Sequence, residues 1–373
     1  MVPGATGRPW ECYLQRLKPG CEKDARLLVY WLLFSFFAVG TLLTREGAQG
    51  SRYSYTFLSL GGLLIAIVIG FRYEVGGDWF PYQRLLSFAR IATFRQLLDL
   101  GDPGYQLLNW LAVEVGARIW LVNLICGAIF AWGLVAFARA QPNPWLAITI
   151  AVPYLVIVVA MGYSRQGVAI GILMAGLARL LRGGTTLQFL FYAVAAALFH
   201  RTAIVLVPLV ILAGSRSRTL NLILALALGF VFYDLFFSSA AERFIRDYIG
   251  AEYNSEGAAV RIAMSIVPAT IFLLGRRRFE FSSLEDRLWR NFSFAAFASL
   301  GLLYLLPSST AVDRMALYLM PMQVAIFSRI PQAYRTSFTT PLILVYAFAV
   351  QFVWLNYADN ASEWLPYQSY LFN

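Results

Sequence analysis

The chain has 373 residues, of which 59% are hydrophobic and only 13% are charged, and its mean hydropathy is +0.63. A soluble domain would carry about 25% charged residues, so this composition excludes an ordinary soluble protein. The net charge is +10, but in so apolar a chain a basic excess reports membrane topology, and we expect no nucleic-acid partner. The three cysteines show no disulfide or metal-ligand spacing, and we expect no metal or other cofactor.

Apolar runs of bilayer-spanning length recur from residue 27 to residue 356. A helix needs about 20 apolar residues to cross a membrane, and continuous runs such as "LNLILALALGFVF" exclude a β-barrel, whose strands alternate. We predict an all-α polytopic integral membrane protein with about 12 transmembrane helices, the short ones tilted, broken or re-entrant. The predicted spans are 27–44, 55–71, 119–139, 145–162, 166–182, 187–200, 202–214, 219–236, 259–275, 290–306, 315–330 and 341–356.

The loops between these spans fall into two sets of different charge. One set holds 14 basic and four acidic residues, and the opposite set, without residues 1–26, holds 11 basic and 13 acidic residues. Excess arginine and lysine marks the cytoplasm, so the second set is predicted to face outward. This set comprises segments 72–118, 163–166, 200–201, 237–258, 307–314 and the tail from 357. A polar, basic extension (1–24) that would itself favour the cytoplasm precedes a single predicted domain (25–373).

Unusual residues gather in the outward set. The stretch "GFRYEVGGDWFPYQRLL" (70–86) presents Arg72, Glu74 and Asp78 directly after an apolar run. Residues 79–100 have apolar side chains at helical spacing with arginines between them, which predicts an amphipathic helix lying in the membrane interface. Segment 102–117 is too short and polar for a span and is expected to form a half-buried helix.

The outward loops predict a cationic cavity at the outer leaflet. Arginines at bilayer depth are costly unless they meet an anion or a carboxylate, and guanidinium groups bind phosphate in a bidentate manner. A helix that starts near Gly167 would add its N-terminal amides. We expect a lipid diphosphate to bind Arg72, Arg165, Arg201, Arg314 and Gln166. Aromatic faces for sugar rings are expected from Tyr73, Trp79, Tyr82, Tyr105, Tyr163, Trp364 and Tyr367.

Five short motifs in a fixed order resemble the EpsG-like family of exopolysaccharide polymerases, which is related in role to the Wzy polymerases. Each motif is weak alone, but the match runs from about residue 25 to the end. The motifs are Arg72, Val75, Gly76, Asp78 and Tyr82; Asp102, Pro103, Gly104 and Tyr105; Arg165, Gln166 and Ala169; Phe199, His200, Thr202 and Ala203; and Asp313 with Arg314. Asp102 departs from the family pattern, where glutamate is more common, and this leaves its role open.

The resemblance implies a multi-pass enzyme of the bacterial inner membrane, with its active site facing the periplasm. It would transfer a growing glycan from undecaprenyl diphosphate to the terminal sugar of a lipid-linked oligosaccharide repeat unit. Likeness to the family also implies a chain-length-regulating co-polymerase as a partner, besides the lipid bilayer. Arginines are expected to stabilise the departing diphosphate without a metal ion.

A base must accept the proton of the attacking hydroxyl, and Asp78, Glu74 and His200 are the candidates. Two of these candidates have a structural alternative. Asp78 would pair with Arg72 or cap a helix, and His200 would be a packing residue. Likewise, Asp313 would merely neutralise Arg314.

Two other functions share part of this pattern. An O-antigen-type ligase, or a glycosyltransferase that uses a polyprenyl-phosphate sugar, would need the same arginines and carboxylates. A transporter or flippase of lipid-linked glycans should show inverted repeats and charges near mid-membrane. The charged residues here cluster at one surface, which favours an enzyme.

Overall fold

The structure is a computed structural model that describes residues 21–44, 52–214, 223, 257–305 and 309–372. Within these ranges the regular secondary structure is helical, apart from one isolated bridge between Arg72 and Ser369. The helices are α2 (Cys21–Leu43), α3 (Arg52–Gly70), α4 (Trp79–Ala89), α5 (Phe94–Leu98), α6 (Pro103–Glu114), α7 (Ile119–Ala138), α8 (Pro144–Ala151), η1 (Val152–Ala160), α9 (Ser164–Leu181), α10 (Thr186–Ala197), η2 (Arg201–Leu206), α11 (Val207–Gly214), α14 (Ala258–Gly275), η3 (Arg276–Phe279), α15 (Ser283–Leu305), α16 (Ser309–Ala316), η4 (Leu317–Leu319), α17 (Met320–Tyr334), α18 (Thr339–Tyr357) and η5 (Asp359–Glu363).

These helices confirm the all-α class, and helices stand at the predicted span positions that fall in the described ranges. The span 219–236, apart from residue 223, and most of the extension 1–24 lie outside the described residues. Among the described residues, three helices are long and apolar enough to cross a membrane, namely Ile119–Ala138, Ala258–Phe279 and Thr339–Tyr357. Five further apolar helices in the described ranges are shorter, so about 12 crossings stay a prediction. The helices that meet the criterion identify a membrane protein.

The core of the bundle is built on close contact between α7 and α9. A side chain at Gly133 of α7 would place its Cβ 1.8 Å from the backbone oxygen of Gly171 in α9. A Cβ at Gly167 would lie 2.9 Å from Cα of Ala160, at the end of η1. The small-residue spacing of Gly167 and Gly171 in "GVAIG" (167–171) thus serves helix packing. It also fixes the start of α9, where Arg165 and Gln166 lie.

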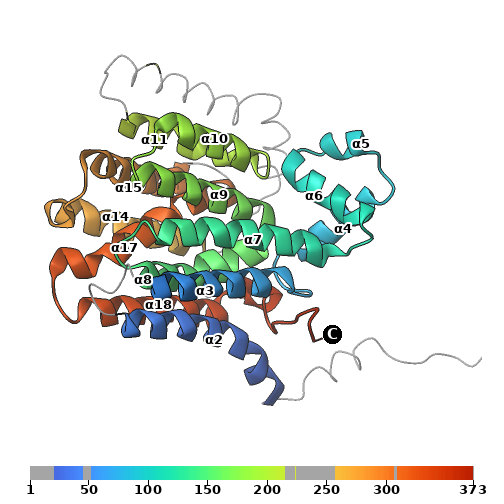
Figure 1. Cartoon of the computed structure of the whole chain (residues 1–373), viewed down its shortest axis with the longest axis horizontal. Coiled ribbons are helices and arrows are strands. Elements are labelled where there is room, and N and C mark those ends of the chain that lie inside the picture. Colours follow the sequence, from blue (N-terminus) through green and yellow to red (C-terminus); the bar gives the residue numbers. More distant parts are fainter. Residues whose placement is uncertain (1–20, 45–51, 215–222, 224–256, 306–308, 373) are drawn as a thin grey trace, which may run out of the picture.

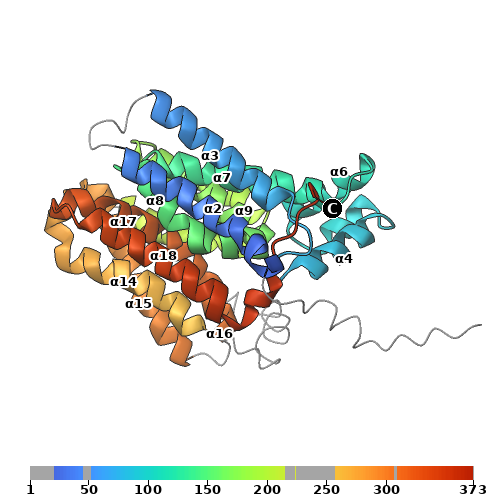
Figure 2. The same cartoon turned by 90° about the horizontal axis from the view of Figure 1, so that it is seen from below.

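One end of the bundle carries α4 and α6, and the C-terminus lies beside them (Figure 1 and Figure 2). We call it the motif end. Here the C-terminal tail pairs with the segment that follows α3. The Tyr73 amide donates to the Gln368 carbonyl over 2.9 Å, and the Tyr370 amide donates to the Phe71 carbonyl over 2.8 Å. Residues almost 300 positions apart are thereby held together at the first motif.

The predicted amphipathic helix over residues 79–100 is two helices, α4 and α5. The Thr93 hydroxyl accepts a hydrogen bond from the Gln96 amide, while the Gln96 side chain accepts from the Thr93 amide. This capping box starts a new helix and so divides the segment. The amphipathic character holds, because α4 buries Trp79, Tyr82, Leu86 and Ala89 at helical spacing. Exposed apolar side chains such as Phe88 and Ile91 remain on the outside.

Candidate active site

A pocket of about 330 Å³ lies at the motif end and is lined by residues from all five motifs. Segments far apart in the sequence meet here because α4, α6, α9, η2 and α16 all place one end at this point. The motif residues at the pocket are Asp78, Tyr82, Asp102, Arg165, Gln166, His200, Thr202 and Arg314. The remaining lining residues are Pro81, Tyr163, Arg201, Ala311 and Met315.

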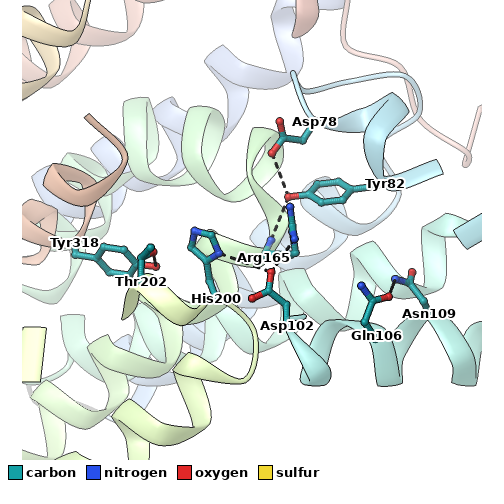
Figure 3. Close-up of polar contacts among 9 residues, drawn as sticks. All are labelled: Asp78, Tyr82, Asp102, Gln106, Asn109, Arg165, His200, Thr202 and Tyr318. Atoms are coloured by element: carbon teal, nitrogen blue, oxygen red, sulfur yellow. Dashed lines mark hydrogen bonds and ion pairs between the residues drawn. The ribbon is translucent and has the colours of Figure 1, made fainter. Parts of the chain in front are cut away.

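Asp78 and Tyr82 form one wall of the pocket (Figure 3). Asp78 stands before α4, but its carboxylate makes no capping bond to that helix. Instead it accepts a hydrogen bond from the Tyr82 hydroxyl over 3.3 Å, and Tyr82 accepts one from the Arg165 backbone amide over 3.4 Å. The Asp78 backbone is held in turn, since its amide donates to the Gly162 carbonyl over 3.3 Å. The half-buried carboxylate of Asp78 therefore faces the pocket with a fixed backbone.

Asp102 joins Arg165 and His200 next to Tyr82 (Figure 3). Its Oδ2 lies 2.7 Å from the Nη1 of Arg165 and 3.9 Å from the Nδ1 of His200. The backbone of Asp102 is left-handed, with φ 50°, a conformation that aspartate tolerates. The next helix is anchored by the Gly104 amide, which donates to the Leu198 carbonyl over 2.8 Å, so Asp102 and His200 are held as neighbours.

The charge of Asp102 follows from these contacts. Burial alone would raise its pKa, but the nearby His200 ring and the charge and hydrogen bond of Arg165 outweigh burial and hold this pKa below its usual value of 3.8. Asp102 is therefore ionised at neutral pH. With Nδ1 of His200 turned toward this carboxylate, the Nε2 atom is the ring nitrogen left to face a substrate.

Arg314 lies on the third side of the pocket. Its Cζ is 3.6 Å from the centroid of the Tyr163 ring, and its backbone carbonyl accepts a hydrogen bond from Nε2 of Gln166 over 2.5 Å. Asp313, which we considered as a neutralising partner, instead binds Nε of Arg261 in α14 over 2.7 Å. The guanidinium of Arg314 is thereby oriented by an aromatic face rather than by the adjacent carboxylate.

Arg72 was predicted to bind diphosphate, but the structure does not bring it to the pocket. It is 1% exposed and donates to protein acceptors from all three guanidinium nitrogens. Its bonds reach the carbonyls of Ile69 and Val75 and the side chains of Asn123 and Ser164. An arginine saturated in this way joins α3, α7 and α9.

Other predicted residues also lie away from the pocket lining. Glu74 is exposed, on a left-handed turn with φ 52°, and the hydroxyl of Tyr367 donates to the Val68 carbonyl within the core. Four predicted aromatic residues also lie outside the pocket lining and pack beside the motif residues instead, namely Tyr73, Trp79, Tyr105 and Trp364. The pocket brings together the other predicted site residues, namely Asp78, His200, Arg165, Arg201, Arg314, Gln166, Tyr82 and Tyr163.

Sequence reasoning left two polar residues of the pocket out of the site. Asp102 was noted in the "DPGY" segment without a role, yet it contacts both Arg165 and His200. Thr202 shares a hydrogen bond with the Tyr318 hydroxyl over 3.1 Å, which ties η2 to η4. The motif positions were the available signal for both. Among the described residues, no group of three or more His, Cys, Asp or Glu side chains is placed to hold a metal ion.

The fold and the site together define a helical membrane protein with an arginine-lined pocket at one end of its bundle. The sequence model of the EpsG family matches residues 55–369, which is most of the chain. The protein therefore belongs to the EpsG family, a family of Wzy-type exopolysaccharide polymerases, and the matched range includes all five motifs. Neither the curated proteins nor the solved structures contain a match to the chain.

Proposed function

We propose that the protein is a polysaccharide polymerase that uses a glycan on undecaprenyl diphosphate as donor. The acceptor is the terminal sugar of a lipid-linked repeat unit in exopolysaccharide or capsule biosynthesis. The observation that carries this proposal is the convergence of Arg165, Arg201 and Arg314 with Asp78 and His200 on one pocket. Guanidinium groups suit a diphosphate because they stay charged and bind its oxygens in pairs.

The reaction needs one bond to form and one to break. A hydroxyl oxygen of the acceptor sugar attacks the anomeric carbon of the donor, and the bond from that carbon to the diphosphate oxygen breaks. Negative charge develops on the leaving diphosphate, where Arg165 and Arg314 stabilise it. The hydroxyl proton passes to a base at the pocket.

Asp78 is the base that we favour. Its carboxylate is half-buried and accepts one hydrogen bond, from Tyr82, so it keeps lone pairs for a hydroxyl proton. His200, oriented by Asp102, is the second candidate through its Nε2 atom. Glu74 is not assigned a role, because it lies outside the pocket lining. Arg72 is buried and holds the start of α9 through its hydrogen bond to Ser164, and we assign it no contact with the diphosphate.

The proposed setting is the bacterial inner membrane, with the pocket facing the periplasm. The charge asymmetry of the loops supports this orientation. The chain-length-regulating co-polymerase also belongs to the proposal. The pocket places its cationic groups at one end of the bundle, where a lipid headgroup would lie.

The test uses purified full-length protein in nanodiscs with a diphosphate-linked repeat unit from its own host. Wild type should give a ladder of longer glycans on a gel, and Asp78→Asn and Arg165→Ala should abolish it. Arg90→Ala, at an exposed position outside the pocket, is the matched control and should keep the ladder. A single transfer to a different acceptor lipid would indicate a ligase. Movement of the intact substrate across a vesicle membrane, without new glycosidic bonds, would indicate a transporter.

A further inference from the structure

A second hollow lies next to the pocket, along one face of α4. It has a volume of about 420 Å³ and is lined by Pro81, Arg84, Leu85, Phe88, Leu100 and Arg165. The first four have the spacing i, i+3, i+4 and i+7, so they form one stripe on α4. Leu100, from the turn before α6, forms the facing wall. We call this hollow the α4 groove.

The α4 groove is continuous with the active-site pocket. Pro81 and Arg165 line both cavities, so the groove opens on the pocket beside the ion pair of Arg165 with Asp102. A larger apolar groove of about 860 Å³ runs between α2 and α3, lined by residues such as Leu32 and Leu64. It shares no lining residue with the pocket. A ligand with its headgroup in the pocket therefore reaches the α4 groove first.

The lining of the α4 groove suits an anionic amphiphile. Leu85, Phe88 and Leu100 provide apolar walls, and Arg84 stands among them. Arg84 makes no ion pair with any carboxylate in the part of the chain that the structure describes. An arginine in such a lining favours a phosphate as its partner. Its apolar neighbours favour a hydrocarbon chain.

The outer end of the α4 groove is bordered by side chains that suit the membrane interface. Phe88 is 39% exposed, Ile91 is 83% exposed, and Leu100 is 49% exposed. Apolar side chains on short amphipathic helices insert at the boundary between headgroups and acyl chains. A chain that leaves the groove on this side would pass directly into the bilayer.

We propose that the α4 groove holds the lipid end of the donor, and this inference rests on the proposed polymerase function. The sugar-bearing phosphate of the diphosphate lies in the pocket, the prenyl-bearing phosphate lies between Arg165 and Arg84, and the first prenyl units lie along Leu85 and Phe88. Arg165 then contacts the diphosphate from the point where the two cavities join. Arg84 is a binding residue for the lipid diphosphate.

Binding of sugar-free polyprenyl diphosphate to the protein in nanodiscs tests this inference without turnover. Arg84→Ala should weaken binding by about tenfold, because a charge-assisted hydrogen bond is lost. Leu85→Asp should weaken it at least as much. The matched controls, Arg90→Ala and Ser87→Asp, change exposed positions outside the groove lining and should bind as wild type does. Equal binding by Arg84→Ala, Leu85→Asp and wild type would overturn the proposal.

Photolabelling locates the chain independently. A polyprenyl diphosphate with a diazirine on its first prenyl unit should label α4 at Leu85 or Phe88. Labelling of Leu32 or Leu64 would place the chain in the α2–α3 groove and overturn the proposal. Competition by phosphatidylglycerol at equal concentration would assign the α4 groove to bulk phospholipid, which also overturns it. If wild type binds the lipid diphosphate in the α4 groove but forms no glycan ladder, the polymerase function fails while the lipid site stands.

Discussion

Arg261 and Asp313 form an ion pair that joins α14 to α16, with 2.7 Å between Nε of Arg261 and Oδ1 of Asp313. Asp313 directly precedes Arg314 in the chain. Both side chains are largely buried, at 17% and 8% exposure. The pair therefore fixes the helix that carries Arg314 while leaving the Arg314 guanidinium directed at the Tyr163 ring. Arg261 acts on the pocket through Asp313 as a positioning residue.

We expect Arg261→Ala to destabilise the protein by about 3 kcal/mol, because it breaks a largely buried ion pair. Glycan formation should fall as well. The exchange Arg261→Asp with Asp313→Arg should restore part of both thermal stability in detergent and ladder formation, since the charges again meet. If the stability and ladder formation of the double variant are no higher than the combined losses of the two single variants predict, the pair does not position α16.

Arg72 and Arg165 should respond differently to the same substitution. Arg72→Lys cannot reproduce the four hydrogen bonds of the buried guanidinium. The free energy of unfolding should therefore fall by about 3 kcal/mol, and the unfolding midpoint should fall with it. Arg165→Lys changes a side chain that is 32% exposed at the pocket, so stability should change little while ladder formation is lost. Thermal unfolding and the gel assay on the same preparations separate the two effects. A stable but inactive Arg72→Lys would contradict the supporting role.

The ion pair of Asp102 predicts a defined pH dependence. The folded-state pKa of this carboxyl is lower than its usual 3.8, so its ionisation stabilises the folded protein above that pH. That contribution is lost as the pH falls through the folded-state value. Asp102→Asn should therefore be less stable than wild type at neutral pH, by about 1 to 3 kcal/mol. The difference should shrink below pH 3.8. A difference that stays constant over this range would show that the charge of Asp102 is not involved.

The helices and the residue types at the pocket could be predicted from the sequence, because both depend on local patterns. Apolar runs mark the helices, and five motifs supply the lining. The orientation of each side chain could not be predicted, since it depends on distant partners. Arg72 is turned inward by Asn123 and Ser164, which lie 51 and 92 positions away. No periodicity in the first motif reports such contacts.

Two local features of the structure do have a signal in the sequence. The segment "TFRQ" has the spacing of a capping box, which divides the amphipathic region into α4 and α5. Asp102 precedes Pro103 and Gly104, a pattern typical of a helix start. A carboxylate at a helix start beside an arginine-rich cavity is a candidate partner for one of those arginines. The number of membrane crossings has no such local signal, because several of the apolar helices are short.

Contact between Gly162 and Trp364 gives a last prediction. Trp364 is 1% exposed, its Nε1 donates to the Ile157 carbonyl over 2.8 Å, and a Cβ at Gly162 would lie 2.2 Å from its ring. The Gly162 carbonyl in turn holds the Asp78 amide. Gly162→Ala should therefore destabilise the protein by about 1 to 3 kcal/mol through overpacking and lower the rate of polymerisation.

The smaller ring of Trp364→Phe should make room for the added methyl group of Gly162→Ala. The double variant should then lose less stability than the sum of the two single changes, as neighbouring residues do in a double-mutant cycle. Heating in detergent followed by size-exclusion chromatography measures each stability, and the ladder assay measures polymerisation. If the two changes add in stability, the tail does not press on Gly162. If they couple in stability but polymerisation stays unchanged throughout, the tail supports the fold without positioning Asp78.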